Sequence, residues 1–102
     1  MKIHHTLTAA ALVALSGLAQ AQVDPVHVRS WAASCAACHG TNGHAQPGMI
    51  SLAGVAKEVT IQKMLDYKAG RVPAATIMHQ LAKGYSDEQI AAIAGYFAAQ
   101  KK

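Results

Sequence analysis

Cys35, Cys38 and His39 form a C-x-x-C-H motif in the segment Cys-Ala-Ala-Cys-His. Two thiols three residues apart at the start of a helix lie on one side of it, at a spacing that matches the two vinyl groups along one porphyrin edge. Each thiol can then form a thioether, and the next residue carries its imidazole toward the iron. The motif therefore predicts one covalently attached haem c, held by Cys35 and Cys38, with His39 as an iron ligand.

Three other chemistries use the same residues. A redox-active dithiol is typical of a βαβ surround, which the sequence does not indicate. A zinc site could combine Cys35, Cys38, His39 and His44, but the dozen or so residues that normally separate the two ligand pairs are missing. A disulfide between Cys35 and Cys38 would close too short a loop to add much stability.

Haem iron bound by one histidine leaves a sixth position, and a thioether there is typical of electron transfer, whereas an open position binds ligands. Met64 lies on an apolar helical stripe and is more typical of a core residue. Met49 follows His39 by only ten residues, in the loop that must first pass the ring edge. Met78 lies far enough along the chain to cover the opposite face, so we expect the metal ligands to be His39 and Met78. His79 is the nearest competitor. The remaining candidates are His27 and His44.

The composition fits one small domain that needs help to fold. The chain has 102 residues, of which 52% are hydrophobic, but only one Trp, three Tyr and one Phe are aromatic. A chain of this length depends more often than a larger one on a cofactor, metal or disulfide. With 14% charged residues it is neither a disordered tail nor a coiled coil. The net charge is +4, and the basic residues are scattered along the chain. This distribution argues against nucleic-acid binding and favours an acidic protein partner.

The N-terminus predicts an export signal. Lys2 precedes an uncharged, mostly small and apolar run, and Ala19-Gln20-Ala21 is a small-x-small cleavage site. We expect a signal peptide over residues 1–21, a mature domain over residues 22–102 and a periplasmic location. The alternative is an uncleaved membrane anchor, although the strongly apolar part is short.

Helix signals recur along the mature chain, and no convincing alternating run predicts a strand. Asp24 and Pro25 indicate a helix start, and residues 57–69 carry a second apolar stripe that Gly70 ends. Residues 76–83 predict a short helix that ends at Gly84, and the segment Ser-Asp-Glu-Gln at 86–89 is a capping box. The apolar stripe of the last helix comprises Ile90, Ile93, Ala94 and Phe97. The sequence predicts an all-α fold of three or four helices around one haem.

Residues 24–100 resemble a small class I cytochrome c of the c-553 type. The similarity is greatest to the monohaem cytochrome subunit of flavocytochrome c sulfide dehydrogenase and to SoxE-like cytochromes. It is carried by the stretches at 35–43 (CAACHGTNG), 52–54 (LAG), 64–71 (MLDYKAGR), 76–90 (TIMHQLAKGYSDEQI) and 93–97 (IAGYF). The resemblance implies a class I cytochrome c fold, with Met78 as the sixth iron ligand.

The resemblance also implies a function. A six-coordinate haem carries single electrons and catalyses nothing by itself, so we expect an electron-transfer protein that accepts electrons from a flavoprotein sulfide dehydrogenase subunit or a similar donor. The alternatives are a free-standing carrier to a terminal oxidase or reductase, and a peroxidase or gas-binding protein with a labile sixth ligand. We expect no small-molecule substrate and no membrane span after signal cleavage.

Two departures from the family pattern affect the loop after His39. Relatives usually carry a proline just before Leu-Ala-Gly, where Ile50 and Ser51 stand, and the loop is about one residue short. In the family a loop carbonyl accepts the second imidazole N–H and orients the ring. We expect the carbonyl of Pro47 to take that role.

Overall fold

The computed structural model describes residues 23–102, so the expected signal peptide at 1–21 lies outside the described residues. Its elements are α1 (Pro25–Ala33), α2 (Ala36–His39), the 3-10 turn η1 (Thr41–Gly43), α3 (Lys57–Lys68), α4 (Ile77–Lys83) and α5 (Asp87–Ala98). The described part contains no strand, which confirms the all-α prediction. The four longer helices are those expected from the sequence, and α2 is an additional single turn that carries the cysteine motif.

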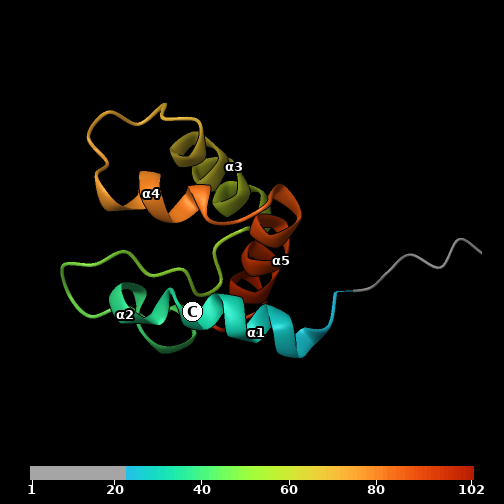
Figure 1. The fold of residues 1–102 in the computed structure, drawn as a ribbon. Helices are drawn as coiled ribbons and strands as arrows, with labels where there is room; N and C mark the ends of the chain where they lie inside the picture. Colours follow the sequence, from blue (N-terminus) through green and yellow to red (C-terminus); the bar gives the residue numbers. More distant parts are fainter. Residues whose placement is uncertain (1–22) are drawn as a thin grey trace, which may run out of the picture.

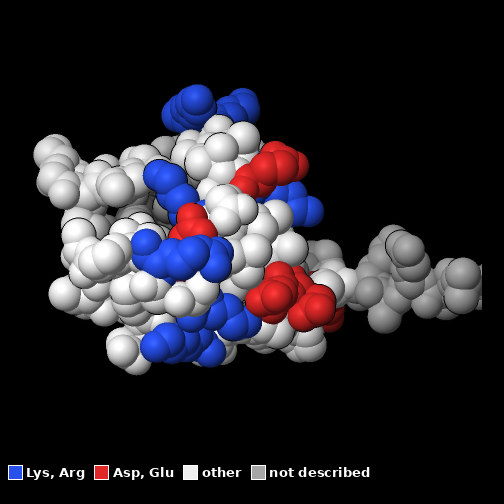
Figure 2. Space-filling view, turned by 90° about the horizontal axis from the view of Figure 1, so that it is seen from above, with Lys and Arg blue, Asp and Glu red and all other residues white. Residues whose placement is uncertain are grey.

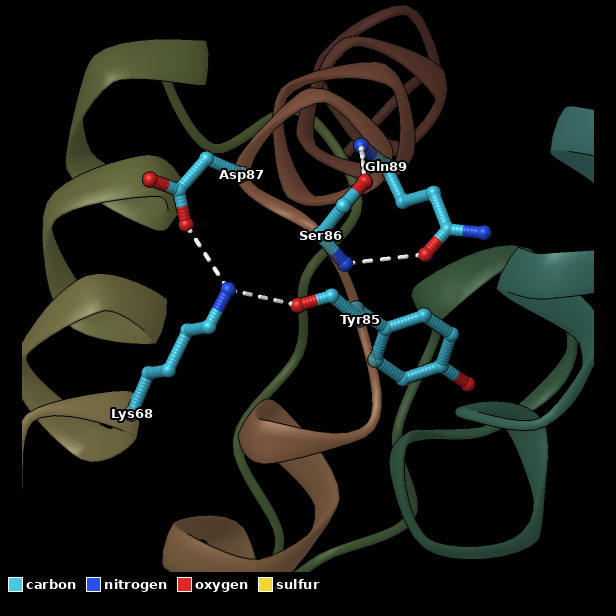
Figure 3. A network of polar contacts seen from close by, with 5 residues as sticks. All are labelled: Lys68, Tyr85, Ser86, Asp87 and Gln89. Carbon is cyan, nitrogen blue, oxygen red and sulfur yellow. Dashed lines mark hydrogen bonds and ion pairs between the residues drawn. The ribbon is translucent and has the colours of Figure 1, made fainter.

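The helix ends follow the signals in the sequence. Asp24 caps α1, and its carboxylate accepts the N–H of Val26 at 2.8 Å. Ser86 and Gln89 form the expected capping box at the start of α5, with reciprocal hydrogen bonds of 3.1 and 2.9 Å (Figure 3). Gly70 follows α3 with a φ of 73°, a left-handed conformation that glycine adopts without strain. Local chemistry therefore determines where these helices begin and end.

The core lies where α1 packs against α5. Ala32 of α1 contacts Ile93 and Phe97 of α5, and each of the three is at most 3% exposed. Partly buried side chains surround this cluster: Trp31, Cys35, Leu52, Tyr85 and Tyr96. All four residues of the predicted α5 stripe are buried, whereas the predicted stripe of α3 is only half-buried. The core thus depends mainly on α5.

Helix α5 connects two halves of the molecule. Figure 1 shows α1 and α2 on one side and α3 with α4 on the other, and α2 and α4 extend away from α5 in the same direction. Helix α3 packs against both α4 and α5. Among residues 23–102 no helix is long and apolar enough to cross a membrane. The arrangement places the cysteine motif and α4 on the same side of the central helix.

Replacing Phe97 by alanine tests this core. Phe97 is 2% exposed, so we expect Phe97→Ala to lower the free energy of unfolding by about 3–5 kcal/mol. Denaturant unfolding of the purified protein measures the change. Val26→Ala is the control, because Val26 is 67% exposed and its loss should cost less than about 0.5 kcal/mol. Equal effects of the two substitutions would contradict the assignment of the core.

Candidate functional site

The cysteine motif lies on a sharp turn between two helices. The backbone N–H of Cys35 donates to the carbonyl of Ala32 at the end of α1, and the N–H of His39 donates to the carbonyl of Cys35 at 2.8 Å. The single turn of α2 therefore puts both thiols on one side of the chain. Both cysteines are free; Cys35 is partly buried against the core and Cys38 is exposed. Burial raises the pKa of the Cys35 thiol, an effect that a hydrogen bond with Ser34 partly offsets.

His39 is oriented by a backbone carbonyl from the following loop. Its Nδ1 lies 2.6 Å from the carbonyl oxygen of Ile50. Because a carbonyl only accepts, Nδ1 carries the proton, and Nε2 keeps a lone pair available to a metal. The imidazole is therefore held in the tautomer that an iron ligand requires.

The expectation that Pro47 supplies this carbonyl is wrong. A turn closed by the hydrogen bond from the N–H of Met49 to the carbonyl of Gln46 contains Pro47 and returns the chain toward His39. Ile50, directly after this turn, is the residue that lies opposite the ring. Because the bond uses only a backbone carbonyl, any residue at this position could supply it. Residue type therefore gave no signal for this contact.

The loop that carries Ile50 is attached to α5. The carbonyl of Gly43 accepts the N–H groups of Leu52 and Ala53 at 2.8 and 3.2 Å, and Gly54 donates to the carbonyl of Phe97 at 2.9 Å. Gly43 has a φ of 81°, and a Cβ there would lie 2.8 Å from a ring carbon of Phe97. Only glycine allows this close approach. The position of the His39 partner is thus determined by α5.

The geometry argues against the zinc alternative. Nε2 of His44 lies 2.7 Å from the carbonyl oxygen of Lys101, and Nδ1 lies 3.3 Å from that of Thr41. Both ring nitrogens therefore face backbone oxygens instead of the cysteines. Within residues 23–102 no group of three histidine, cysteine or acidic side chains is placed to hold a metal ion. His44 instead links the loop to the C-terminal residues.

The candidate sixth ligands differ in what surrounds them. Met78 is half-buried in the first turn of α4. The neighbouring His79 packs its ring against Tyr67 of α3, with centroids 6.2 Å apart, and its Nε2 is buried and has no hydrogen-bond partner among the described residues. Because protein atoms enclose this nitrogen, the His79 side chain would have to rotate away from Tyr67 before it could bind a metal. Met64 is half-buried on α3, and Met49 is 48% exposed in the turn after the motif.

The surfaces beside the motif suit a large apolar group. Residues 30–56 and 72–82 contain no Asp, Glu, Lys or Arg. They carry four large apolar side chains that are about half or more exposed: Met49 (48%), Ile50 (65%), Ile77 (64%) and Leu81 (49%). Such a concentration of exposed apolar side chains indicates a binding surface. Together with two free thiols and an oriented imidazole, these residues fit a covalently bound porphyrin.

A comparison with protein families decides between the chemistries that the motif allows. The family described as Cytochrome c matches residues 28–101, which is nearly all of the described chain. The chain belongs to the cytochrome c family. Membership implies a covalently bound haem c and electron transfer as its function, in agreement with the sequence prediction.

Curated relatives are similar over much of this chain. Cytochrome c4 of Azotobacter vinelandii is 35% identical over 96 residues, and that of Pseudomonas aeruginosa is 38% identical over 90. Each match covers 85% of this chain and 46% or 43% of the relative, respectively. The cytochrome subunit of sulfide dehydrogenase from Chlorobaculum tepidum is 41% identical over 64 residues, which is 63% of this chain and 57% of the relative. The chain thus spans about half the length of the curated relatives it matches.

Gly40 offers a test of the turn that follows His39. It has a φ of 78°, and a Cβ there would overlap the carbonyl oxygen of His44. We expect Gly40→Ala to lower the free energy of unfolding by at least about 2 kcal/mol, because strain and overlap add. Gly48→Ala is the matched control: its φ is 93° but nothing lies within 4 Å, so it should cost only about 1 kcal/mol. Unfolding curves that rank the two variants equally would contradict the close contact at Gly40.

Proposed function

We propose that Cys35 and Cys38 form the two thioether bonds to the haem, and that His39 and Met78 are its axial ligands. The observation that carries the proposal is the hydrogen bond from His39 Nδ1 to the carbonyl of Ile50, at 2.6 Å. It leaves Nε2 unprotonated next to two free thiols, which is the donor set that haem c attachment uses. A redox dithiol needs no such histidine, and a zinc site would need further ligands, which no group of side chains within residues 23–102 is placed to supply.

Met78 is the preferred distal ligand for two reasons. It is half-buried near the start of α4, whereas the Nε2 of His79 is enclosed against α3. The thioether is also a neutral, soft donor, which stabilises the ferrous over the ferric state and raises the reduction potential. A carrier with both axial positions filled changes little in geometry when it gains or loses an electron.

The chain's own residues then have distinct roles in electron transfer. The haem supplies the reversible one-electron change, and the protein attaches, orients and encloses it. The bond to Ile50 fixes the His39 tautomer, and the attachment of residues 43–54 to α5 keeps that bond in place. If His39 and Met78 both bind the iron, no coordination position would remain for a substrate, and the group would serve to carry single electrons.

Substitution of Met78 tests the ligand assignment. In Met78→Ala we expect the weak red charge-transfer band of the ferric protein to disappear, the reduction potential to fall and the ferrous protein to bind carbon monoxide rapidly, because the sixth position is then open. His79→Ala and Met64→Ala are the controls and should keep the band. If Met78→Ala keeps the band and His79→Ala or Met64→Ala changes the spectrum instead, Met78 is not the ligand.

For the electron donor we propose a flavoprotein subunit that oxidises sulfide. The support is the similarity to the relative named as a cytochrome subunit of sulfide dehydrogenase. The relatives named cytochrome c4 support a second candidate, a free-standing carrier to an oxidase or reductase. Co-purification of a flavin-containing chain with this protein favours the first candidate, and its absence favours the second.

We propose that the redox partner docks on residues 30–56 and 72–82, which carry no Asp, Glu, Lys or Arg. The basic residues then lie outside the contact. Figure 2 shows Lys and Arg interspersed with Asp and Glu over much of this face, whereas the stretch at its left side carries no charged side chain. The exposed Ile77 and Leu81 lie on one of these segments. An apolar contact excludes water at the haem edge and does not depend on long-range attraction.

This placement predicts a weak dependence of electron transfer on salt. The second-order rate constant with the partner protein should change by less than about threefold between about 0.01 and 0.5 M ionic strength, because few charges meet at the contact. Stopped-flow spectroscopy at the haem absorbance measures it. A decrease of more than about tenfold would instead assign docking to the basic residues.

We also propose that residues 1–21 are an export signal that is cleaved after Ala21. The basic start, the uncharged run and the small-x-small site in the sequence support it. A periplasmic location follows. The mass of the exported, haem-containing chain distinguishes a cleaved signal from a retained anchor.

A further inference from the structure

The short helix α4 carries Met78, yet little of it is buried. It has seven residues, and only Ala82 is fully buried, while Ile77 and Leu81 are 64% and 49% exposed. Among the residues that the structure describes, no side chain caps its first turn. A helix this short is not stable on its own, so contacts beyond α4 must determine where Met78 lies.

The C-terminal end of α4 is held by an ammonium group from α3. Lys68 Nζ donates to the carbonyl of Tyr85 at 2.7 Å and to the carboxylate of Asp87 at 2.8 Å. Figure 3 shows the Lys68 side chain reaching from α3 to the joint between α4 and α5. A positive charge is favourable at the end of a helix, where unpaired carbonyls accumulate. The side chain of Lys68 is 31% exposed, so this contact is partly shielded from water.

Tyr85 extends the connection to the opposite half of the molecule. Its hydroxyl lies 2.6 Å from Oγ of Ser34, the residue before Cys35. Ser34 donates its only hydroxyl proton to the carbonyl of Trp31 at 2.8 Å, so the Tyr85 hydroxyl is the donor in this pair. The N–H of Tyr85 also bonds to the carbonyl of Ala82 in α4. One residue thus contacts α3, α4 and the end of α1.

We propose that Lys68 and Tyr85 are positioning residues that keep the Met78 sulfur on the haem iron. Their contacts connect the segment that carries Met78 to the segment that carries Cys35, so they set the separation of the two faces of the site. The proposal rests on the assignment of Met78 as axial ligand. Removing the hydrogen bonds of Lys68 or Tyr85 should increase the fraction of molecules in which the Met78 sulfur is not bound to the iron.

The test uses imidazole binding to the ferric holoprotein, because imidazole competes with the sulfur for one position. We expect Lys68→Met and Tyr85→Phe each to lower the apparent dissociation constant for imidazole by about three- to tenfold, the scale of one hydrogen bond at a partly exposed site. The red charge-transfer band should weaken in parallel. Lys68→Arg, which keeps the charge and donors, should restore most of the effect.

Lys63→Met is the matched control. Lys63 lies on the same helix and is exposed, so the substitution makes the same change in charge away from Tyr85. Imidazole affinity should stay within about twofold of the unsubstituted protein, a margin that covers the small effect of one distant surface charge. If Lys68→Met and Tyr85→Phe lower the free energy of unfolding but leave imidazole affinity at the level of Lys63→Met, the residues are only structural and the proposal is overturned.

The two proposals fail in different ways. If Met78 is not the ligand, Met78→Ala keeps the red band and its imidazole affinity does not change. If Met78 is the ligand but Lys68 and Tyr85 do not position it, Met78→Ala binds imidazole strongly while the other variants behave like Lys63→Met. Tyr85→Phe removes only one hydroxyl and keeps the partly buried ring, so we expect this variant to fold. It can therefore be used for the test if Lys68→Met does not fold.

Discussion

The structure depends on the direct contact between the loop after the cysteine motif and α5. Gly43 lies against the ring of Phe97, and the N–H of Gly54 bonds to the Phe97 carbonyl. Because Gly43 also accepts the N–H groups of Leu52 and Ala53, the residues just before them are held close to His39. The hydrogen bond from His39 to Ile50 is therefore a consequence of helix packing, and in the proposed holoprotein it would orient the imidazole toward the iron. Tyr96 adds a further bond across the same contact, from its hydroxyl to Asn42 at 2.6 Å.

The two faces of the site are held by different physical means. On the His39 side, the two cysteines provide covalent attachment in the proposed holoprotein, and backbone hydrogen bonds position the loop. On the Met78 side, a seven-residue helix with one fully buried residue provides much less local stability. Regions with few buried contacts open first. In the proposed holoprotein the Met78 side is therefore the more easily changed, and side-chain contacts such as those of Lys68 would have the greatest influence there.

Local sequence signals predicted most of the fold, because each depends on residues close together in the chain. The Asp24 cap and the Ser86–Gln89 capping box were both identifiable from two or three neighbouring residues. The cysteine motif was equally local. What the sequence could not give directly were the partners across the fold: Ile50 for His39, and Tyr85 for both Lys68 and Ser34. Two of these contacts use a backbone carbonyl, which leaves no trace in residue type, so Pro47 was a reasonable but wrong expectation.

The high alanine content is consistent with the expectation that so small a chain needs a cofactor to complete its core. Of the seven buried apolar residues in the described part, four are alanines: Ala32, Ala53, Ala82 and Ala94. Ala94 lies on the α5 face that Ile93 and Phe97 share, and Ala82 lies in the short α4. Small side chains allow helix backbones to approach closely, but each contributes little buried apolar area. The large side chains of the core gather at α5, so the side of the molecule that bears α2 and α4 has no comparable apolar centre of its own. A porphyrin attached at Cys35 and Cys38 would add apolar volume on that side, so we expect its attachment to stabilise the folded chain.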